Sequence, residues 1–372
     1  MTRHLRPVAA ALLMIGVWLA VSSAQAQDAA SLQNWSGKAD WEATVAAAKK
    51  EGKLVIAGPP GSTWRGALTA FAEDYGIPVE LTQIDITFWT RLRQERQVGQ
   101  YLWDAVVLPP STDAYRMIND DHGMTDVRAL LVLPEVVDDK AWAGGFENLF
   151  NDNGRKYSIG FSLQATPGAW VNRDKVPASE LSSMDQLIEP RFKGMMSSQD
   201  YHEGAPLNLF GPLIRDPRYG ADFVKKMLAN DITFVANGGQ QVDWLIRGKY
   251  PIGLGILTAG LLNAKAQGIA DHVQALAGIL RYSSGNSGLM VFKEAPHPNA
   301  VKLYANWLLT KRAQQLIADK VNYNSRRLDV KVADPTTAVD VSRLKDYINT
   351  HREDIAPYYA QWVKLAEESV KH

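Results

Sequence analysis

Residues 41–61 read WEATVAAAKKEGKLVIAGPPG, and this stretch decides the fold class. Three of its residues share one helical face: Trp41, Val45 and Ala48. Gly52 stands where a residue in the left-handed conformation ends such a helix. The apolar run at 54–57 is typical of a strand that is buried on both faces. The stretch therefore predicts a helix, a buried strand and a Gly/Pro turn in succession.

The same alternation continues along the chain. Residues 67–75 predict a second helix that Gly76 closes, and residues 88–98 predict a third. Strands are predicted at 79–83 and 104–108. Strands that alternate with helices of about 10–14 residues imply right-handed crossovers and a mostly parallel sheet. The fold class is therefore α/β.

A second α/β unit is predicted in the middle of the chain. Residues 157–172 are typical of extended chain interrupted at Pro167-Gly168, and Asn237-Gly238-Gly239 opens a helix that ends at Gly248. A strand is predicted to follow at 251–256. Pro298 then begins a further helix.

The composition narrows the class of protein. The chain has 372 residues, with 40 basic and 40 acidic side chains and no cysteine. This length predicts two domains or one large one. A content of 46% apolar and 22% charged residues is typical of globular proteins. Zero net charge gives no sign of nucleic-acid binding. The lack of cysteine excludes disulfides, thiolate metal sites and lipid attachment through a cysteine.

The N-terminus has the pattern of a secretory signal peptide. Arg3 and Arg6 precede an uncharged stretch at 7–21, and Ala24-Gln25-Ala26 supplies small residues around a cleavage site. We expect residues 1–26 to be removed, leaving an exported protein that is not a lipoprotein and does not insert into the membrane. A transmembrane anchor is the alternative, although the run is short for roughly 30 Å of hydrocarbon.

The sequence gives little sign of a catalytic or metal-binding site. The sequence contains no Walker loop, no Gly-x-Ser-x-Gly elbow and no His-Glu-x-x-His pair, so we expect no cofactor and no catalytic residues. A hydrolase with a dispersed catalytic site stays an alternative. Residues 200–203 (DYHE) offer metal ligands, but adjacent side chains of an extended segment point to opposite faces. A polar loop is favoured there, and Tyr201 with His202 stays the alternative metal site.

Two of the eleven tryptophans are candidates for ligand contact. Trp64 and Trp170 each lie beside a Gly/Pro turn at a presumed strand end, which is the edge where open α/β sheets bind ligands. Packing in the core is an equally favoured role for both. Three others lie on apolar helical faces and are expected to be buried: Trp41, Trp307 and Trp362.

Together these pieces resemble the periplasmic solute-binding proteins of ABC importers, in the branch related to ferric-ion binders. The resemblance covers nearly the whole chain after residue 26, with its pieces in the family's order. The segments that carry it are WEATVAAAKKEG at 41–52, GPPG at 58–61, DAVVL at 104–108, PHPNA at 296–300, WLLT at 307–310 and NSRRLDV at 324–330.

The resemblance implies a two-lobe periplasmic-binding-protein type II fold, with a hinge and a ligand cleft between the lobes. Lobe 1 is expected at 27–165, with roughly 283–315 returning to it. Lobe 2 is expected at 166–282, joined by C-terminal helices at roughly 316–372.

The implied cleft would bind ligand through backbone amides of the turns that precede helices. Candidate ligand-binding residues in these turns are Gly61, Ser62, Thr63, Pro110, Ser111, Gly238 and Gln240. An ordinary helix cap is an equally favoured role for each turn. Trp64, Trp170 or Tyr201 would stack on a flat part of the ligand. Arg281, just before the presumed hinge return at Tyr282, would pair with a carboxylate or phosphonate, and a surface arginine is the alternative.

One departure from the ferric binders bears on the ligand. Those proteins place two neighbouring tyrosines in the turn after the strand predicted here at 251–256, whereas residues 257–261 of this chain read LTAGL. Tyr358-Tyr359 is adjacent in sequence but lies in the C-terminal helical region, where packing is expected.

The sequence therefore predicts a non-enzymatic, monomeric receptor that captures a small anionic organic solute. It would deliver that solute to an inner-membrane ABC permease. A ferric or other metal-ion binder of the same fold is the first alternative, and a periplasmic enzyme with a dispersed site is the second.

Overall fold

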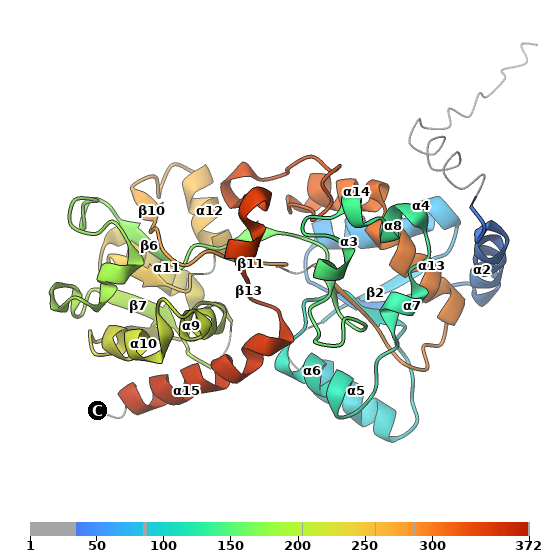
Figure 1. Cartoon of the computed structure of the whole chain (residues 1–372), viewed down its shortest axis with the longest axis horizontal. Coiled ribbons are helices and arrows are strands. Elements are labelled where there is room, and N and C mark those ends of the chain that lie inside the picture. The colour runs from blue at the N-terminus through green and yellow to red at the C-terminus, as the bar shows by residue number, and fades with distance from the viewer. Residues whose placement is uncertain (1–34, 85–87, 203, 257, 286, 371–372) are drawn as a thin grey trace, which may run out of the picture.

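The computed structural model describes residues 35–84, 88–202, 204–256, 258–285 and 287–370. The predicted signal peptide lies outside these residues. Within them the strands form two five-stranded sheets and one three-stranded sheet. The two larger sheets occupy opposite ends of the molecule, each with its own helices (Figure 1).

The first sheet has the order β2-β1-β3-β12-β4. Its strands are β1 (Leu54–Gly58), β2 (Val79–Gln83), β3 (Ala105–Val106), β4 (Ile159–Gly160) and β12 (Gly288–Val291). β1 runs parallel to β2 and β3, while β12 runs antiparallel to β3 because the chain returns from the second sheet. The predicted strands at 54–57 and 79–83 are confirmed, and the strand predicted at 104–108 is shorter.

Helices and short 3-10 turns cover this sheet. They are α2 (Lys38–Glu51), α3 (Ser62–Leu68), α4 (Phe71–Tyr75), α5 (Phe88–Gln97), α6 (Thr112–Asn119), α7 (Val127–Leu130), α8 (Pro134–Val137), η1 (Asp139–Ala141), η2 (Phe146–Leu149), α13 (Pro298–Leu309) and α14 (Lys311–Val321). The single helix predicted at 67–75 is in fact split between α3 and α4. The backbone tightens there, since the N–H of Ala72 donates to the carbonyl of Thr69 at 3.0 Å.

The second sheet has the order β10-β6-β9-β7-β8. Its strands are β6 (Ala169–Asn172), β7 (Met196–Gln199), β8 (Thr233–Val235), β9 (Ile252–Leu254) and β10 (Val273–Ala275). β7, β8 and β9 are parallel, so their carboxyl ends lie at one edge. The helical elements around this sheet are η3 (Met184–Ile188), η4 (Pro190–Phe192), α9 (Ala205–Arg215), α10 (Gly220–Leu228), α11 (Gly238–Arg247), α12 (Thr258–Ala266) and α15 (Ala356–Val370).

Three short strands cross between the two ends of the molecule. β5 (Gln164–Ala165) and β11 (Arg281–Ser283) pair antiparallel, and β13 (Ile348–Asn349) pairs with β11 in parallel. They lie between the two larger sheets (Figure 1). The 3-10 turns η5 (Pro335–Thr337), η6 (Val341–Asp346) and η7 (Glu353–Ile355) lie on either side of β13 in the sequence. The chain therefore connects its two lobes three times.

Each lobe has its own apolar core. Trp41 and Trp307 are buried in the first core and Trp362 in the second, as their helical faces predicted. The boundaries expected for the lobes stay a prediction. Within the C-terminal part, α14 packs on α3 beside the first sheet, whereas α15 packs on α9 beside the second. No helix among the described residues is long and apolar enough to cross a bilayer.

Candidate functional site

A cavity of about 550 Å³ lies between the two lobes. The first lobe contributes the turn after β3, from Leu108 to Asp113, together with Trp89 of α5. The second lobe contributes His202 and the first turn of α9. The third wall is the chain between β13 and α15, including Thr350, His351 and Arg352. The carboxyl ends of β3 and β7 thus lead into one cavity, which is where α/β folds bind ligands.

Two helices begin at this cavity. Ser111 caps α6 by accepting a hydrogen bond from the N–H of Ala114 at 3.2 Å. α9 begins after Gly204, whose φ of 72° is a conformation that favours glycine. The N-terminus of a helix carries a partial positive charge and unpaired N–H groups. Both lobes therefore present positive helix ends to the cavity.

A buried arginine lies behind the first turn of α9. The Arg281 guanidinium donates to the carbonyl oxygens of Asn208 at 2.5 Å and Pro167 at 2.7 Å. Its Nε has no hydrogen-bond partner, and no carboxylate pairs with it among the described residues. Burial lowers the pKa of Arg281 to about 10. The surface position weighed for Arg281 is therefore wrong: the side chain is a buried cation close to the cavity, held by main-chain oxygens.

Two phenols also line the cavity. The Tyr115 hydroxyl donates to the carbonyl of His351, and the Tyr359 hydroxyl contacts the carbonyl of Thr350 and Oδ1 of Asn208. Burial raises the pKa of both tyrosines. The packing role predicted for Tyr358-Tyr359 holds for Tyr358, which contacts the second core, but Tyr359 faces the cavity.

His351 forms a pair with Ser283 of the crossing strand β11. Its Nε2 lies 2.8 Å from Oγ of Ser283, which also accepts the N–H of Gly285. A serine beside a histidine is a part of many hydrolytic sites. Here burial lowers the pKa of His351 to about 4, so the ring is a weak base, and no carboxylate orients it among the described residues. The pair is better suited to holding β11 against the chain that follows β13 than to activating a nucleophile.

The lowered pKa of His351 predicts a pH dependence of stability. Its ring is neutral in the folded protein down to about pH 4, whereas an unfolded histidine takes up a proton near pH 6.5. The unfolded chain therefore binds more protons between these values, and the free energy of unfolding should fall as the pH drops from 6.5 to 4. Urea unfolding across this range measures the slope, and His351→Gln should flatten it. An equal slope in both proteins would assign the effect to other groups.

The structure brings together only some of the residues predicted to bind ligand. Pro110 and Ser111 line the cavity, whereas Arg281 is not among its lining residues. His202, which was considered only as an alternative metal ligand, also lines it. Gly61, Ser62 and Thr63 form the start of α3, and Gly238 and Gln240 lie in the first turn of α11, where Asn237 caps the helix. None of these five residues belongs to the cavity wall as described.

The three aromatic candidates for stacking contact protein groups. Trp64 is buried, with its ring 5.3 Å from Tyr323. Trp170 is buried in a cluster with Val242 and Leu261. Tyr201 packs against Phe234 at 5.2 Å. Tyr282, the hinge candidate, is also buried, beside Leu163 and Leu344. All four support the fold, and their roles in binding stay predictions.

The cavity also contains residues that the sequence did not single out. Trp89 follows Phe88 at the start of α5, and its helix position gave no reason to prefer it over the other tryptophans. Thr350, His351 and Arg352 belong to a polar segment without helical or strand periodicity. Tertiary contacts bring them to the cavity, namely the pairing of β13 with β11 and the bonds of His351 to Tyr115 and Ser283. A pattern within the sequence had no means to indicate such contacts.

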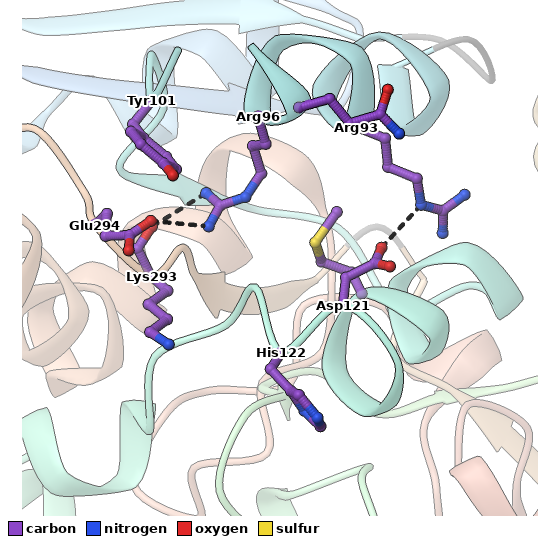
Figure 2. Close-up of a pocket in the computed structure, with 9 residues that line it drawn as sticks. Arg93, Arg96, Tyr101, Asp121, His122, Lys293 and Glu294 are labelled. Atoms are coloured by element: carbon purple, nitrogen blue, oxygen red, sulfur yellow. Dashed lines mark hydrogen bonds and ion pairs between the residues drawn. The ribbon is translucent and has the colours of Figure 1, made fainter. Parts of the chain in front are cut away.

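A second cavity, of about 370 Å³, lies on the first lobe beside α5 (Figure 2). Its arginines already have carboxylate partners. Arg93 donates to Asp121 at 2.9 Å and Arg96 to Glu294 at 3.4 Å, and Figure 2 shows both pairs. Because these cations are neutralised within the protein, this cavity is a weaker candidate for an anion than the cavity between the lobes.

The geometry around Tyr201 and His202 gives little support for a metal site. The His202 ring lies 4.2 Å from that of Tyr201, and its Nδ1 is 2.7 Å from Oδ1 of Asp200. Among the described residues, which leave out Glu203, no group of three His, Cys, Asp or Glu side chains is arranged to hold a metal ion.

The comparisons with known proteins identify similar folds. A family model described as bacterial extracellular solute-binding protein matches residues 121–315. The apo form of FutA2 from Synechocystis PCC6803 superposes with a TM-score of 0.64 at 15% identity, covering 86% of this chain and 98% of that one. A Trichodesmium FutA (IdiA) in complex with iron and citrate superposes with a TM-score of 0.62 at 18% sequence identity. The match covers 85% of this chain and 98% of that one. A Bordetella ferric binding protein superposes with a TM-score of 0.62 at 21% sequence identity, and the match covers 86% of this chain and 99% of that one. No curated protein matches significantly.

Proposed function

Because this chain belongs to the bacterial extracellular solute-binding proteins, we propose that it captures a small anionic organic solute in the cavity between its lobes. In this proposal the receptor works in the periplasm and passes the solute to an inner-membrane ABC permease. The observation that carries the anionic character is the buried Arg281, which has no carboxylate partner among the described residues.

Burying an unpaired charge is costly, so a cation in this position is expected to serve a purpose. The Arg281 guanidinium is bonded to the carbonyl of Asn208, and Asn208 itself lines the cavity. The positive ends of α6 and α9 add to the same field. An anion bound here would meet favourable charge from both lobes without requiring a net positive protein.

The apolar part of the cavity favours an organic solute over a simple inorganic ion. Trp89, Leu108 and Leu207 all contribute to its wall. A volume of about 550 Å³ is within the range of sites for small organic ligands. We therefore assign to Trp89, which lines the cavity, the stacking role that the sequence had suggested for Trp64, Trp170 or Tyr201.

The solute can be identified from the protein as purified without refolding. Native mass spectrometry should show a bound mass that denaturation releases, and the released compound should carry a carboxylate, phosphonate or similar anion. Adding it back should change the tryptophan fluorescence, and Trp89→Phe should remove most of that change. A released compound that is neutral or cationic would contradict the proposal.

Replacing the buried cation separates binding from stability. We expect Arg281→Met to weaken binding of the identified solute at least roughly tenfold, since an uncompensated charge close to the site contributes on the order of 2 kcal/mol. The free energy of unfolding should fall by less than the loss of two hydrogen bonds alone implies, because removing the desolvation cost of the cation partly offsets the two carbonyls left without a donor. Calorimetry and urea unfolding measure the two effects. Arg281→Lys, which keeps the charge, is the matched control and should retain more affinity than Arg281→Met.

Ferric binding is the second candidate, because the similar Trichodesmium protein is described with iron and citrate. Two tyrosines line the cavity here, but both phenols contact main-chain carbonyls and burial raises the pKa of both. Iron prefers the phenolate, which this environment disfavours. Titration with ferric citrate should therefore give no tyrosinate charge-transfer band. A band that Tyr115→Phe or Tyr359→Phe abolishes would favour the iron binder.

A further inference from the structure

The chain between β13 and α15 is bonded to both lobes at once. Glu353 is bonded to the first lobe. Its Oε1 accepts from Nδ2 of Asn119 at 2.6 Å, and its Oε2 accepts from the N–H of Asn153 at 2.7 Å. Its own N–H donates to the carbonyl of Asn151 at 3.0 Å. Three partners from the first lobe thus hold one residue of this segment.

The neighbouring carboxylate faces the other way. Oδ2 of Asp354 lies 2.7 Å from Nη2 of Arg215, at the end of α9 in the second lobe. α15 begins two residues later and packs along α9, where the ring of Trp362 stacks on Phe210. Figure 1 shows α15 running along the second lobe toward the place where α6 of the first lobe lies. Adjacent acidic residues therefore bind opposite lobes.

The same segment forms a wall of the cavity. Thr350, His351 and Arg352 line it, and the carbonyl of His351 accepts the hydroxyl of Tyr115 from α6. The side chain of Thr350 is buried, and its hydroxyl has no hydrogen-bond partner in the described structure. A solute in the cavity would touch the residues that also set the distance between the lobes.

We propose that residues 349–354 form an interlobe latch that couples occupancy of the cavity to the relative position of the lobes, with Glu353 as the positioning residue. The latch itself follows from contacts within the protein. Its coupling to a solute rests on the proposed function. When the contacts of Glu353 to Asn119 and Asn153 are broken, fewer bonds hold the first lobe to the latch, and the third wall of the cavity is placed less firmly.

The latch is tested by the distance between the lobes in the unliganded protein. Because the chain has no cysteine, Lys140→Cys on the first lobe and Lys226→Cys on the second give two defined positions for spin labels, both exposed. In this background we expect Glu353→Ala to broaden the distance distribution and shift it to longer values. Asn119→Ala should do the same to a smaller extent. Asn119 is exposed, so this variant decides the test if Glu353→Ala does not fold.

Glu147→Gln is the matched control. Glu147 pairs with Arg128 and Arg155, all within the first lobe, so the same loss of a carboxylate charge should leave the distance distribution unchanged. Distributions of both latch variants that equal the parent distribution would overturn the latch, and so would a shift as large in Glu147→Gln. These measurements need no solute, so they stand even if the proposed function fails.

The coupling to the solute has its own measurement. With the compound released from the purified protein, Asn119→Ala and Glu353→Ala should bind about tenfold more weakly than the parent, as expected when a hydrogen bond to a charged group that supports the bound state is lost. Unchanged affinity together with a shifted distance distribution would show that the latch sets the lobe position but does not couple to binding, and would overturn that part of the proposal.

Discussion

Replacing Trp362 by alanine is expected to lower the free energy of unfolding by about 3–5 kcal/mol. The side chain is fully buried, and its ring stacks on Phe210 with 3.7 Å between centroids and 7° between planes. Its Nε1 also donates to the carbonyl of Tyr201 at 3.0 Å. The truncation removes a fully buried side chain of α15 from the second core and leaves a large cavity and an unpaired carbonyl. Urea unfolding followed by circular dichroism measures the loss.

Trp362→Phe is the control for this prediction. It keeps a ring against Phe210 but loses the hydrogen bond to Tyr201, so about 1–2 kcal/mol should be lost. A loss in Trp362→Ala no larger than in Trp362→Phe would mean that α15 contributes little to the stability of the second lobe. The latch proposal would then lack the rigid support that α15 gives to Asp354 and its neighbours.

The secondary structure was predictable where local chemistry decides it. Gly52, Gly76 and Gly248 each follow an apolar helical pattern, and all three adopt the left-handed conformation, with φ of 81°, 70° and 72°. Glycine reaches this conformation without the steric cost that a side chain imposes. The buried run at 54–57 likewise forms β1 because both faces of this strand are covered. At such positions the residue type and the local pattern are enough to predict the structure.

The cavity was only partly predictable, because its walls are joined by tertiary contacts. Pro110 and Ser111 follow a recognisable strand, so the edge of the sheet indicated them. His351 and Tyr359 reach the cavity only because the chain crosses between the lobes a third time, through two residues of β13. A two-residue strand has no hydrophobic periodicity by which the sequence could indicate it.

Trp64 is a residue that the sequence indicated as a ligand contact but that the structure places in a core. Its place beside a Gly/Pro turn suggested the ligand edge of the sheet, but α3 begins at Ser62 and turns the ring inward. There it meets Tyr323 edge-on in the first core. Whether a side chain at a strand end faces the solvent or the core depends on the direction in which the next helix leaves, and the sequence does not specify that direction.

Gly288→Ala is expected to be strongly destabilising, by about 3 kcal/mol or more, and to disturb the cavity as well. Gly288 lies in β12, where an added Cβ would sit 2.1 Å from the carbonyl oxygen of Leu108 and 2.9 Å from Cα of Pro109. These are backbone atoms, so no side-chain rotation relieves the clash, and the turn that carries Leu108 and Pro110 into the cavity must move. Urea unfolding should show the loss of stability, and any protein that still folds should bind the solute more weakly.

Gly66→Ala is the matched control, with the opposite expected sign. In α3 an added Cβ would have only Lys320 Nζ nearby, at 3.8 Å, and alanine favours a helix over glycine by roughly 0.5–1 kcal/mol. The same one-carbon addition should therefore stabilise the protein slightly there and leave solute affinity unchanged. If Gly288→Ala were tolerated as well as Gly66→Ala, β12 and the turn after β3 would not be in the tight contact that positions the first-lobe wall of the cavity.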